Sequence, residues 1–374
     1  MKFDFGFSKV QLDLTKFWYK INLLLLFFRS TFHLIMTSNL TFETIPFKAL
    51  DGFECNLKHV IRETEPTKGP LLFVHGAGVR ANIFNAPNKT NLIKEAVKAG
   101  YDVWLENWRA SIDLPKNEWN LDIVARNDHP AAVRKIVELT GKKELKAIIH
   151  CQGSTSFMMS AILGLVPEVK TIISNAVSLH PIVPGFSVFK LNILIPIVKL
   201  MFKYLNPQWG RNAPDIKSKI LQFIVALFHQ ENDTMVGKFV SFIYGSGFPA
   251  LWELSNLNEE TRLWIQDEFA NVPLSFFSQI QQCVRKGVLT SVDGQNICYA
   301  PDVPGTDARV VLFGGEKNKC FKAESQQKTF DYLESKAPGK HKLYRLEKYS
   351  HLDVFYGKDA HKDVFPIMLE ELEK

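Results

Sequence analysis

Short apolar runs alternate with helical stretches along residues 70–174, and this alternation constrains the fold more than any other feature. Residues 71–74, 102–105, 145–150 and 169–174 have the length and apolar character of buried parallel strands. Residues 91–99 and 128–139 have helical patterns. Strands that alternate with helices form βαβ units. The sequence therefore predicts an α/β protein with a mostly parallel sheet flanked by helices.

The alternation is preceded by a hairpin pattern and interrupted once. Residues 42–62 alternate apolar and polar side chains around Asp51-Gly52, which is typical of a β-hairpin. From residue 181 to residue 294 the chain is apolar, aromatic and mostly helical in pattern. A connection of that length needs structure of its own, since ordinary connections have about 4–6 residues. Strand character then returns at residues 310–313 and 341–348, with helical patterns at 323–336 and 353–373.

We therefore predict four parts along the chain. They are an N-terminal segment at residues 1–40, a first part of the sheet core at 41–180, a helical cap or lid insertion at 181–294, and a second part of the core at 295–374.

Composition excludes several classes of protein. The net charge of +6 is mild for 374 residues, and no stretch has the Lys/Arg clustering of a nucleic-acid binder. The five cysteines stand far apart, their number is odd, and no CxxC pair occurs. We therefore expect neither a disulfide framework nor a structural zinc site, and a cytoplasmic, reducing location.

The N-terminal segment contains an apolar stretch at residues 17–36. Lys20, Arg29 and His33 interrupt it, so it is too broken for a membrane span, which needs about 20 mainly apolar residues. No small-residue cleavage site of a signal peptide follows it. We expect a helix that packs on the body or in a dimer, with peripheral contact to a membrane surface as the alternative.

A strand that leads directly into a helix carries the candidate nucleophile. Residues 145–156 read LKAIIHCQGSTS, with Cys151 at the turn and Gly153 and Ser154 on the helical side. A nucleophile at such an elbow needs small neighbours, because its backbone is strained and its side chain must stand clear. A helix N-terminus also favours a thiolate. The alternative is that Cys151 is a small buried apolar residue.

The candidate base is His351, which follows the last predicted strand and precedes the last helix. A loop in that position brings a side chain to the carboxyl end of the sheet, where the elbow also lies. The turn after residues 310–313 offers Glu316 as the acid that orients the imidazole, and we favour it over Asn318, whose amide could orient a neutral ring. The alternative is that Glu316 and Asn318 are both turn residues at the surface.

Small residues after the first buried strand offer backbone amides to an oxyanion. The motif is Val74-His75-Gly76-Ala77-Gly78, and the amides of Ala77 and Gln152 are the candidate donors. Nucleophile, acid and base follow one another in the chain order expected of the α/β-hydrolase fold.

Several motifs resemble the acid-lipase branch of the α/β-hydrolases. They are HGAG at residues 75–78, DVWLENW at 102–108, NDHP at 127–130, HCQGS at 150–154 and SHLDVFYG at 350–357. The sequence is most similar to bacterial members that accompany cholesterol-oxidase-like oxidoreductases. The resemblance implies a covalent acyl-enzyme on a lipid-like ester, the insertion as lid, no cofactor, and an oxidoreductase as partner.

Two departures from the lipase pattern keep the reaction open. Cys151 stands where those lipases have serine, and Lys317 stands where they have the acid, an aspartate. A cysteine elbow also occurs in polyhydroxyalkanoate synthases. We therefore predict an acyl-ester hydrolase with Cys151, His351 and Glu316 as its triad. The alternatives are a thioester hydrolase or acyltransferase, and a non-catalytic binding or partner protein.

Overall fold

The structure of the protein is a computed structural model that describes residues 40–374. Within these residues an eight-stranded sheet has the order β1-β2-β4-β3-β5-β6-β9-β10. The strands are β1 (Thr41–Lys48), β2 (Glu54–Ile61), β3 (Pro70–Val74), β4 (Asp102–Asn107), β5 (Leu145–His150), β6 (Val169–Asn175), β9 (Arg309–Gly315) and β10 (Lys342–Leu346). All strands from β4 to β10 in this order pair in parallel, whereas β1 and β2 form an antiparallel hairpin that joins β4. The predicted α/β class and mostly parallel sheet are confirmed.

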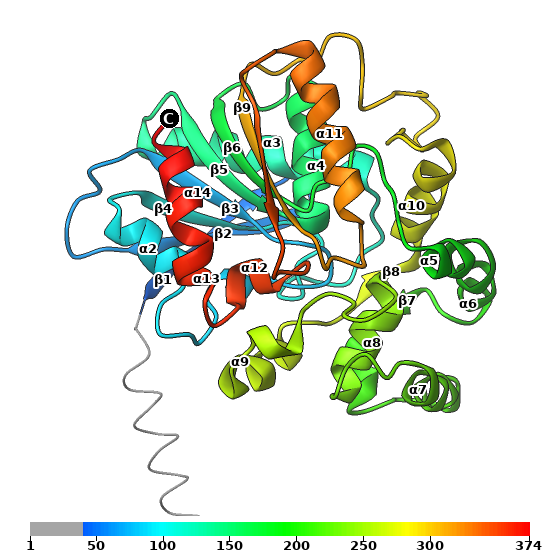
Figure 1. Ribbon diagram of the computed structural model, residues 1–374. Helices are drawn as coiled ribbons and strands as arrows, with labels where there is room; N and C mark the ends of the chain where they lie inside the picture. Colours follow the sequence, from blue (N-terminus) through cyan, green and yellow to red (C-terminus); the bar gives the residue numbers. More distant parts are fainter. Residues whose placement is uncertain (1–39) are drawn as a thin grey trace, which may run out of the picture. The chain divides into compact units, whose positions relative to one another are not determined.

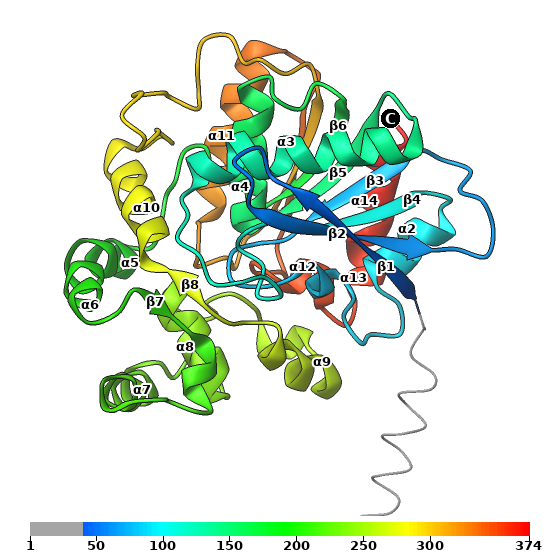
Figure 2. The ribbon, with the colours of Figure 1, turned by 180° about the vertical axis from the view of Figure 1, so that it is seen from behind.

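Helices cover both faces of the sheet. On one face α2 (Leu92–Lys98) contacts α14 (Phe365–Leu372), and on the other α3 (Leu121–Thr140) packs against α4 (Cys151–Ile162). Figure 1 shows α14 in front of the sheet, and Figure 2 shows α3 in front from behind. The helix α11 (Ala323–Lys336) lies between β9 and β10 in sequence. The central strand β3 is apolar and wholly buried, because both its faces are covered.

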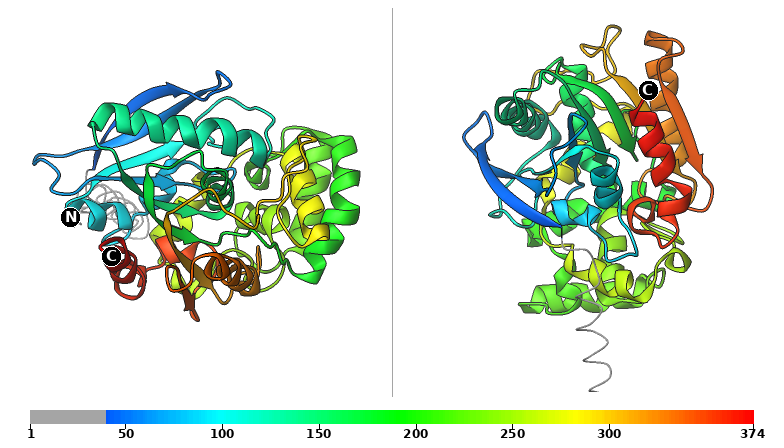
Figure 3. Two further views of the ribbon diagram at one scale, coloured as in Figure 1. Left: turned by 90° about the horizontal axis from the view of Figure 1, so that it is seen from above. Right: turned by 90° about the vertical axis from the view of Figure 1, so that its left-hand side faces the viewer.

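Most of the remaining helices form the connection between β6 and β9. They are α5 (Gly185–Phe189), η2 (Lys190–Leu194), α6 (Ile195–Met201), α7 (Ile216–Phe228), α8 (Met235–Tyr244), α9 (Glu259–Trp264) and α10 (Leu274–Lys286), together with the two-stranded pair β7 (Tyr204–Leu205) and β8 (Val272–Pro273). Figure 3 shows these helices grouped at one end of the sheet. We call residues 181–294 the insertion.

Two helices differ from the sequence-based expectation. α3 begins at Leu121, seven residues before the predicted start, because the Asn120 side chain accepts from the Ile123 amide and caps the helix there. The predicted helix at residues 353–373 is instead three helices, α12 (Asp353–Tyr356), α13 (Ala360–Asp363) and α14. Among residues 40–374 no helix is long and apolar enough to cross a membrane. Most of the predicted segment at residues 1–40 lies outside the described residues.

Candidate active site

The nucleophile position lies at a sharp turn between β5 and α4. Cys151 has a φ of 57°, in the left-handed region that disfavours a residue with a side chain. A Cβ atom on Gly153 would lie 2.0 Å from the His75 carbonyl oxygen, and one on Gly76 would lie 2.8 Å from Cys151 Cβ. Only glycine therefore fits at positions 76 and 153. The strained turn and these two close approaches hold the Cys151 side chain at the first turn of α4, beside the loop that follows β3.

Two backbone amides face the Cys151 thiol. Burial raises the pKa of this thiol to about 12, while hydrogen bonds from the amides of Gln152 and Ala77 act in the opposite direction. At neutral pH the free protein therefore holds a neutral thiol. The two amides predicted to form an oxyanion hole thus converge on the sulfur, and an oxygen on a carbon bonded to that sulfur would come within their reach.

His351 lies beside Cys151 on the loop between β10 and α12. The Cys151 Sγ atom and one ring nitrogen from each of His351 and His150 all lie within 4.8 Å of one another. His351 is wholly buried, and burial lowers the pKa of its ring to about 3, so the imidazole is neutral. Its Nε2 atom has no hydrogen-bond partner among residues 40–374. The structure therefore brings together the predicted nucleophile, base and amide donors.

The insertion and a buried carboxylate hold the His351 loop. The amides of His351 and Leu352 both donate to the Leu251 carbonyl, at 3.0 and 2.9 Å. Asp353 accepts from the Ser350 amide at 2.8 Å, and burial raises the pKa of Asp353 to about 6. The position of the imidazole therefore depends on the insertion as well as on the sheet.

Asn318, rather than Glu316, contacts the His351 ring. The Asn318 side-chain nitrogen lies 3.1 Å from His351 Nδ1, and its Oδ1 accepts from the Cys320 amide at 2.9 Å. Because the oxygen is engaged by that backbone N–H, the NH₂ group faces the ring and donates to Nδ1. The ring proton of His351 is then on Nε2. Glu316 instead forms an ion pair with Arg345 at the surface, and no hydrogen bond joins it to His351 within residues 40–374.

Known proteins with similar sequences are lipases and esterases. No protein-family model matches the chain. A probable lipase of Schizosaccharomyces pombe is 24% identical over 325 residues, which cover 80% of this chain and 69% of that protein. Sterol esterase 2 of Saccharomyces cerevisiae is 21% identical over 380 residues, which cover 86% of this chain and 68% of that protein.

A solved structure identifies the fold. A soluble variant of monoglyceride lipase from Saccharomyces cerevisiae superposes with a TM-score of 0.56 at 14% identity, over 90% of this chain and 95% of that chain. This chain has the α/β-hydrolase fold. The strand order, the elbow after β5 and the histidine loop after β10 all lie where that fold expects its site.

The site also contains a second imidazole, which the sequence analysis did not assign. His150 is buried, and its ring centre lies 4.9 Å from that of His351. The Asn175 side-chain nitrogen lies 2.9 Å from His150 Nδ1 and 3.0 Å from the His351 carbonyl oxygen. A nitrogen between two acceptors donates to both, so the ring proton of His150 is also on Nε2. No pattern in the sequence shows where a ring one residue before the elbow points.

Cysteine and two histidines in such proximity are also the ligand types that zinc prefers. Zinc binds a ring nitrogen through its lone pair, and the opposite nitrogen then donates a proton to an acceptor. Here Asn175 and Asn318 donate to both Nδ1 atoms, so both Nε2 atoms carry hydrogen. The cluster therefore suits an anion better than a cation.

A buried network supports the elbow of the α/β-hydrolase core from below. Glu106 Oε2 lies 2.9 Å from His129 Nδ1, and His129 Nε2 lies 2.7 Å from Ser156 Oγ. Ser156 also donates to the Gln152 carbonyl at 3.0 Å. All three side chains are wholly buried inside the core, and Ser156 lies within α4 rather than at its start. The network therefore fastens α4 to β4 and α3 instead of forming a second reaction centre.

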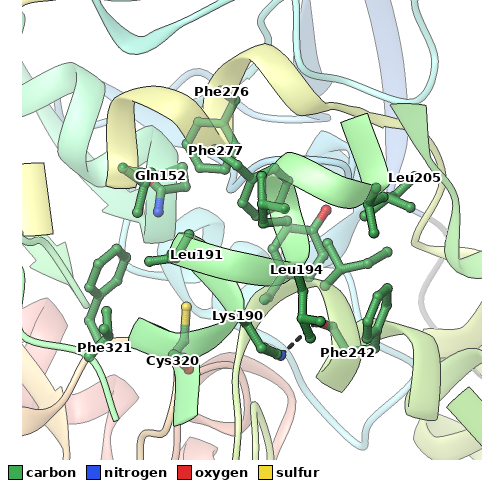
Figure 4. Close-up of a pocket in the computed structure, with 17 residues that line it drawn as sticks. Gln152, Lys190, Leu191, Leu194, Leu205, Phe242, Phe276, Phe277, Cys320 and Phe321 are labelled. Carbon is green, nitrogen blue, oxygen red and sulfur yellow. Dashed lines mark hydrogen bonds between the residues drawn. The ribbon is translucent and has the colours of Figure 1, made fainter. Parts of the chain in front are cut away.

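An apolar pocket opens beside the elbow (Figure 4). The insertion supplies most of its lining, and Gln152 lies at the elbow end. Lys190 is the one charged residue in the lining, and its ammonium donates to the carbonyls of Ser241, Phe242 and Gly245 at the end of α8. Burial lowers the pKa of Lys190 to about 8. The lining residues are Gln152, Val183, Ser187, Lys190, Leu191, Leu194, Ile195, Val198, Leu205, Phe242, Ile243, Tyr244, Phe276, Phe277, Ile280, Cys320 and Phe321.

Tyr244 joins this pocket to the loop after β3, which contains Ala77 and Gly78. Its hydroxyl donates to the Ala77 carbonyl at 3.1 Å, and a Cβ on Gly78 would lie 2.3 Å from the same hydroxyl. The insertion thus touches both the loop of the amide donors and the loop of His351. Residues 186–205 and 242–252 of the insertion contribute to the lining, whereas residues 220–228 do not.

Proposed function

We propose that this chain hydrolyses esters of apolar acyl groups, with Cys151 as the nucleophile and the insertion as a cap over the pocket. The observation that carries the proposal is the convergence of Cys151, His351 and the amides of Ala77 and Gln152 beside an apolar pocket. Similarity to a probable lipase and to a sterol esterase supports an ester as the bond that is cleaved. A lining of aliphatic and aromatic side chains suits an acyl chain.

The first half of the reaction forms an acyl-enzyme. The Cys151 sulfur attacks the ester carbonyl carbon, a C–S bond forms, and negative charge develops on the carbonyl oxygen. The amides of Ala77 and Gln152 donate to that oxygen. As the C–O bond breaks, the thiol proton passes through His351 Nε2 to the leaving oxygen, and an alcohol departs.

The second half restores the enzyme. Water attacks the acyl carbon and gives a proton to His351 Nε2, and the C–S bond breaks. The proton returns to the Cys151 sulfur, and a carboxylic acid leaves. The sum is ester plus water to acid plus alcohol, and its balance needs no cofactor.

Asn318 makes this proton transfer costly. His351 Nε2 accepts a proton only when the ring proton sits on Nδ1, and that tautomer loses the hydrogen bond from Asn318, a cost of about 1 kcal/mol. An acid in this position would accept the Nδ1 proton instead. We therefore expect slower turnover than in a triad with a carboxylate.

The same observation favours thioesters as a second class of substrate. A thiolate leaves without a proton far more readily than an alkoxide, because a thiol has a pKa of about 8.5. A weak proton carrier therefore slows ester cleavage more than thioester cleavage. The second candidate function is thus acyl-thioester hydrolysis or acyl transfer from a thioester, again through Cys151.

One experiment separates these functions from a non-catalytic role. The purified full chain is incubated with ethyl esters of increasing acyl length, whose alkoxide must be protonated to leave, and, in parallel, with acyl-coenzyme A of the same lengths. Release of the carboxylic acid is followed by mass spectrometry, which also maps acyl adducts on the intact chain and its peptides. Cys151→Ala removes the proposed nucleophile, and Cys283→Ala is the matched control, since Cys283 is also a buried free thiol.

We expect an acyl adduct on Cys151 and turnover of esters, both lost in Cys151→Ala and kept in Cys283→Ala. An adduct with acyl-coenzyme A alone would assign the second candidate. Neither adduct nor turnover across both series would contradict both and leave a binding or partner protein.

A further inference from the structure

The outer side of the insertion exposes many large apolar side chains. Most of the exposed large apolar residues in the described part of the chain lie between residues 186 and 228. Leu200 is 87% exposed, Ile216 78% and Phe223 70%. Single exposed apolar residues are ordinary, but a gathering of this size marks a surface that contacts something apolar.

The segment α5–η2–α6 is apolar on both of its faces. Leu191, Leu194 and Val198 line the pocket beside the elbow, whereas Phe189 and Ile197, on the opposite face, are exposed. A surface helix of a globular protein normally has a polar outer face. This segment therefore separates the acyl pocket from an apolar exterior by the thickness of one helix.

The helix α7 turns its wider apolar face outward. Ile216, Ile220, Phe223 and Leu227 follow one another at helical spacing and are all exposed, whereas the inward-facing Val225 is wholly buried. Helices α6 and α7 both lie at the outer side of the insertion, away from the sheet (Figures 1 and 2).

The charges on this surface are basic. Lys199, Lys203, Lys217 and Lys219 are exposed, and Asp215 is the single acidic residue between residues 185 and 228. An apolar helical face with lysines beside it is the pattern of a helix that lies in the interface of an anionic membrane.

We propose that α6 and α7 form a docking surface for an anionic phospholipid bilayer. A second copy of the chain is the less favourable occupant, because a symmetric interface would bring like-charged lysines together. A bilayer brings phosphate groups to the lysines and acyl chains to the apolar faces. It also places apolar substrates one helix away from the pocket. The proposal needs no step of the proposed reaction, so it stands or falls separately.

The test is flotation of the full chain with vesicles of phosphatidylcholine alone or mixed with phosphatidylglycerol. The main variant is Leu200→Glu/Phe223→Glu, and Lys217→Glu/Lys219→Glu tests the charges. Val303→Glu is the matched control, because Val303 is 84% exposed and lies outside the insertion. Thermal unfolding of each variant checks that it folds, and size-exclusion chromatography reports the oligomeric state.

We expect the unmodified chain to float with the mixed vesicles. Leu200→Glu/Phe223→Glu should weaken binding at least tenfold, Lys217→Glu/Lys219→Glu should remove the preference for phosphatidylglycerol, and Val303→Glu should bind normally. Undiminished flotation of the first variant, as expected if the N-terminal apolar segment alone binds lipid, would overturn the proposal. The proposal would also be overturned if the unmodified chain did not float but formed dimers, and the substitutions Leu200→Glu/Phe223→Glu dissociated those dimers.

Discussion

The side-chain nitrogen of Asn318 lies 3.1 Å from Nδ1 of His351, where a catalytic triad has a carboxylate oxygen. The two groups differ in whether they accept or donate the proton of the hydrogen bond with Nδ1. A carboxylate accepts the Nδ1 proton and favours the charged ring, whereas the amide donates to Nδ1 and favours the neutral ring with its proton on Nε2. Asn318 therefore limits the base strength of the residue next to the nucleophile.

Replacing Asn318 by aspartate should make the site more reactive. A carboxylate 3 Å from Nδ1 raises the pKa of His351 and frees Nε2 to accept the thiol proton. We expect Asn318→Asp to raise the rate of acyl-enzyme formation about tenfold or more, since each pKa unit corresponds to about 1.4 kcal/mol. Single-turnover mass spectrometry measures that rate. Asn318→Leu removes the donor without adding an acceptor, so it should raise the rate only by the cost of the lost hydrogen bond, about 1 kcal/mol or about fivefold. A gain in Asn318→Leu equal to that in Asn318→Asp would show that the carboxylate adds nothing.

The alkylation of Cys151 by iodoacetamide should rise steeply with pH. The reactive species is the thiolate, and burial raises the pKa of this thiol to about 12. Below that pH the thiolate fraction falls about tenfold for each pH unit, so the rate should keep rising from pH 7 to pH 11. The exposed Cys298 provides an internal reference in the same peptide map. A rate for Cys151 that levels off near neutral pH would show a preformed thiolate and refute this prediction.

The backbone at Cys151 should be strained enough to measure. Its φ of 57° costs a residue with a side chain about 1 kcal/mol relative to glycine. Cys151→Gly should therefore be more stable to urea than Cys151→Ala by about 1 kcal/mol, although both remove the thiol and both should lose acyl-enzyme formation. A glycine variant less stable than the alanine variant would mean that the turn stores no such strain.

The main elements of the fold could be predicted from the sequence because each has a local cause. The apolar runs at residues 71–74 and 145–150 are buried on both faces, and Asp51-Gly52 supplies the hairpin turn. The last part of the chain was predicted as one helix at residues 353–373, whereas the structure has three. Its pattern is continuous, but the chain bends at Gly357, where a Cβ atom would lie 2.5 Å from the Asp353 carbonyl oxygen.

The sequence predicted which strands and loops form the site, but not which side chains contact one another there. Chain order and topology bring Cys151 and His351 to one edge of the sheet. Glu316 and Asn318 stand two residues apart in one turn, and their directions depend on Arg345 of the neighbouring strand and on the Cys320 amide. Neither partner has a signature in the sequence. The oxidoreductase partner and the cytoplasmic location stay predictions.

The size of the acyl group should depend on the pocket wall formed by the η2 segment. Leu194 lines the pocket, and a larger side chain there would occupy space that a long acyl chain needs. We expect Leu194→Trp to lower kcat/KM for long-chain p-nitrophenyl esters at least tenfold, about 1.4 kcal/mol, with little change for the acetate. Ile193→Trp is the matched control, because Ile193 is the neighbouring residue and is 48% exposed. Equal losses for short and long esters in Leu194→Trp would indicate a damaged fold and not a shortened pocket. Unchanged chain-length preference would mean that the acyl group binds elsewhere.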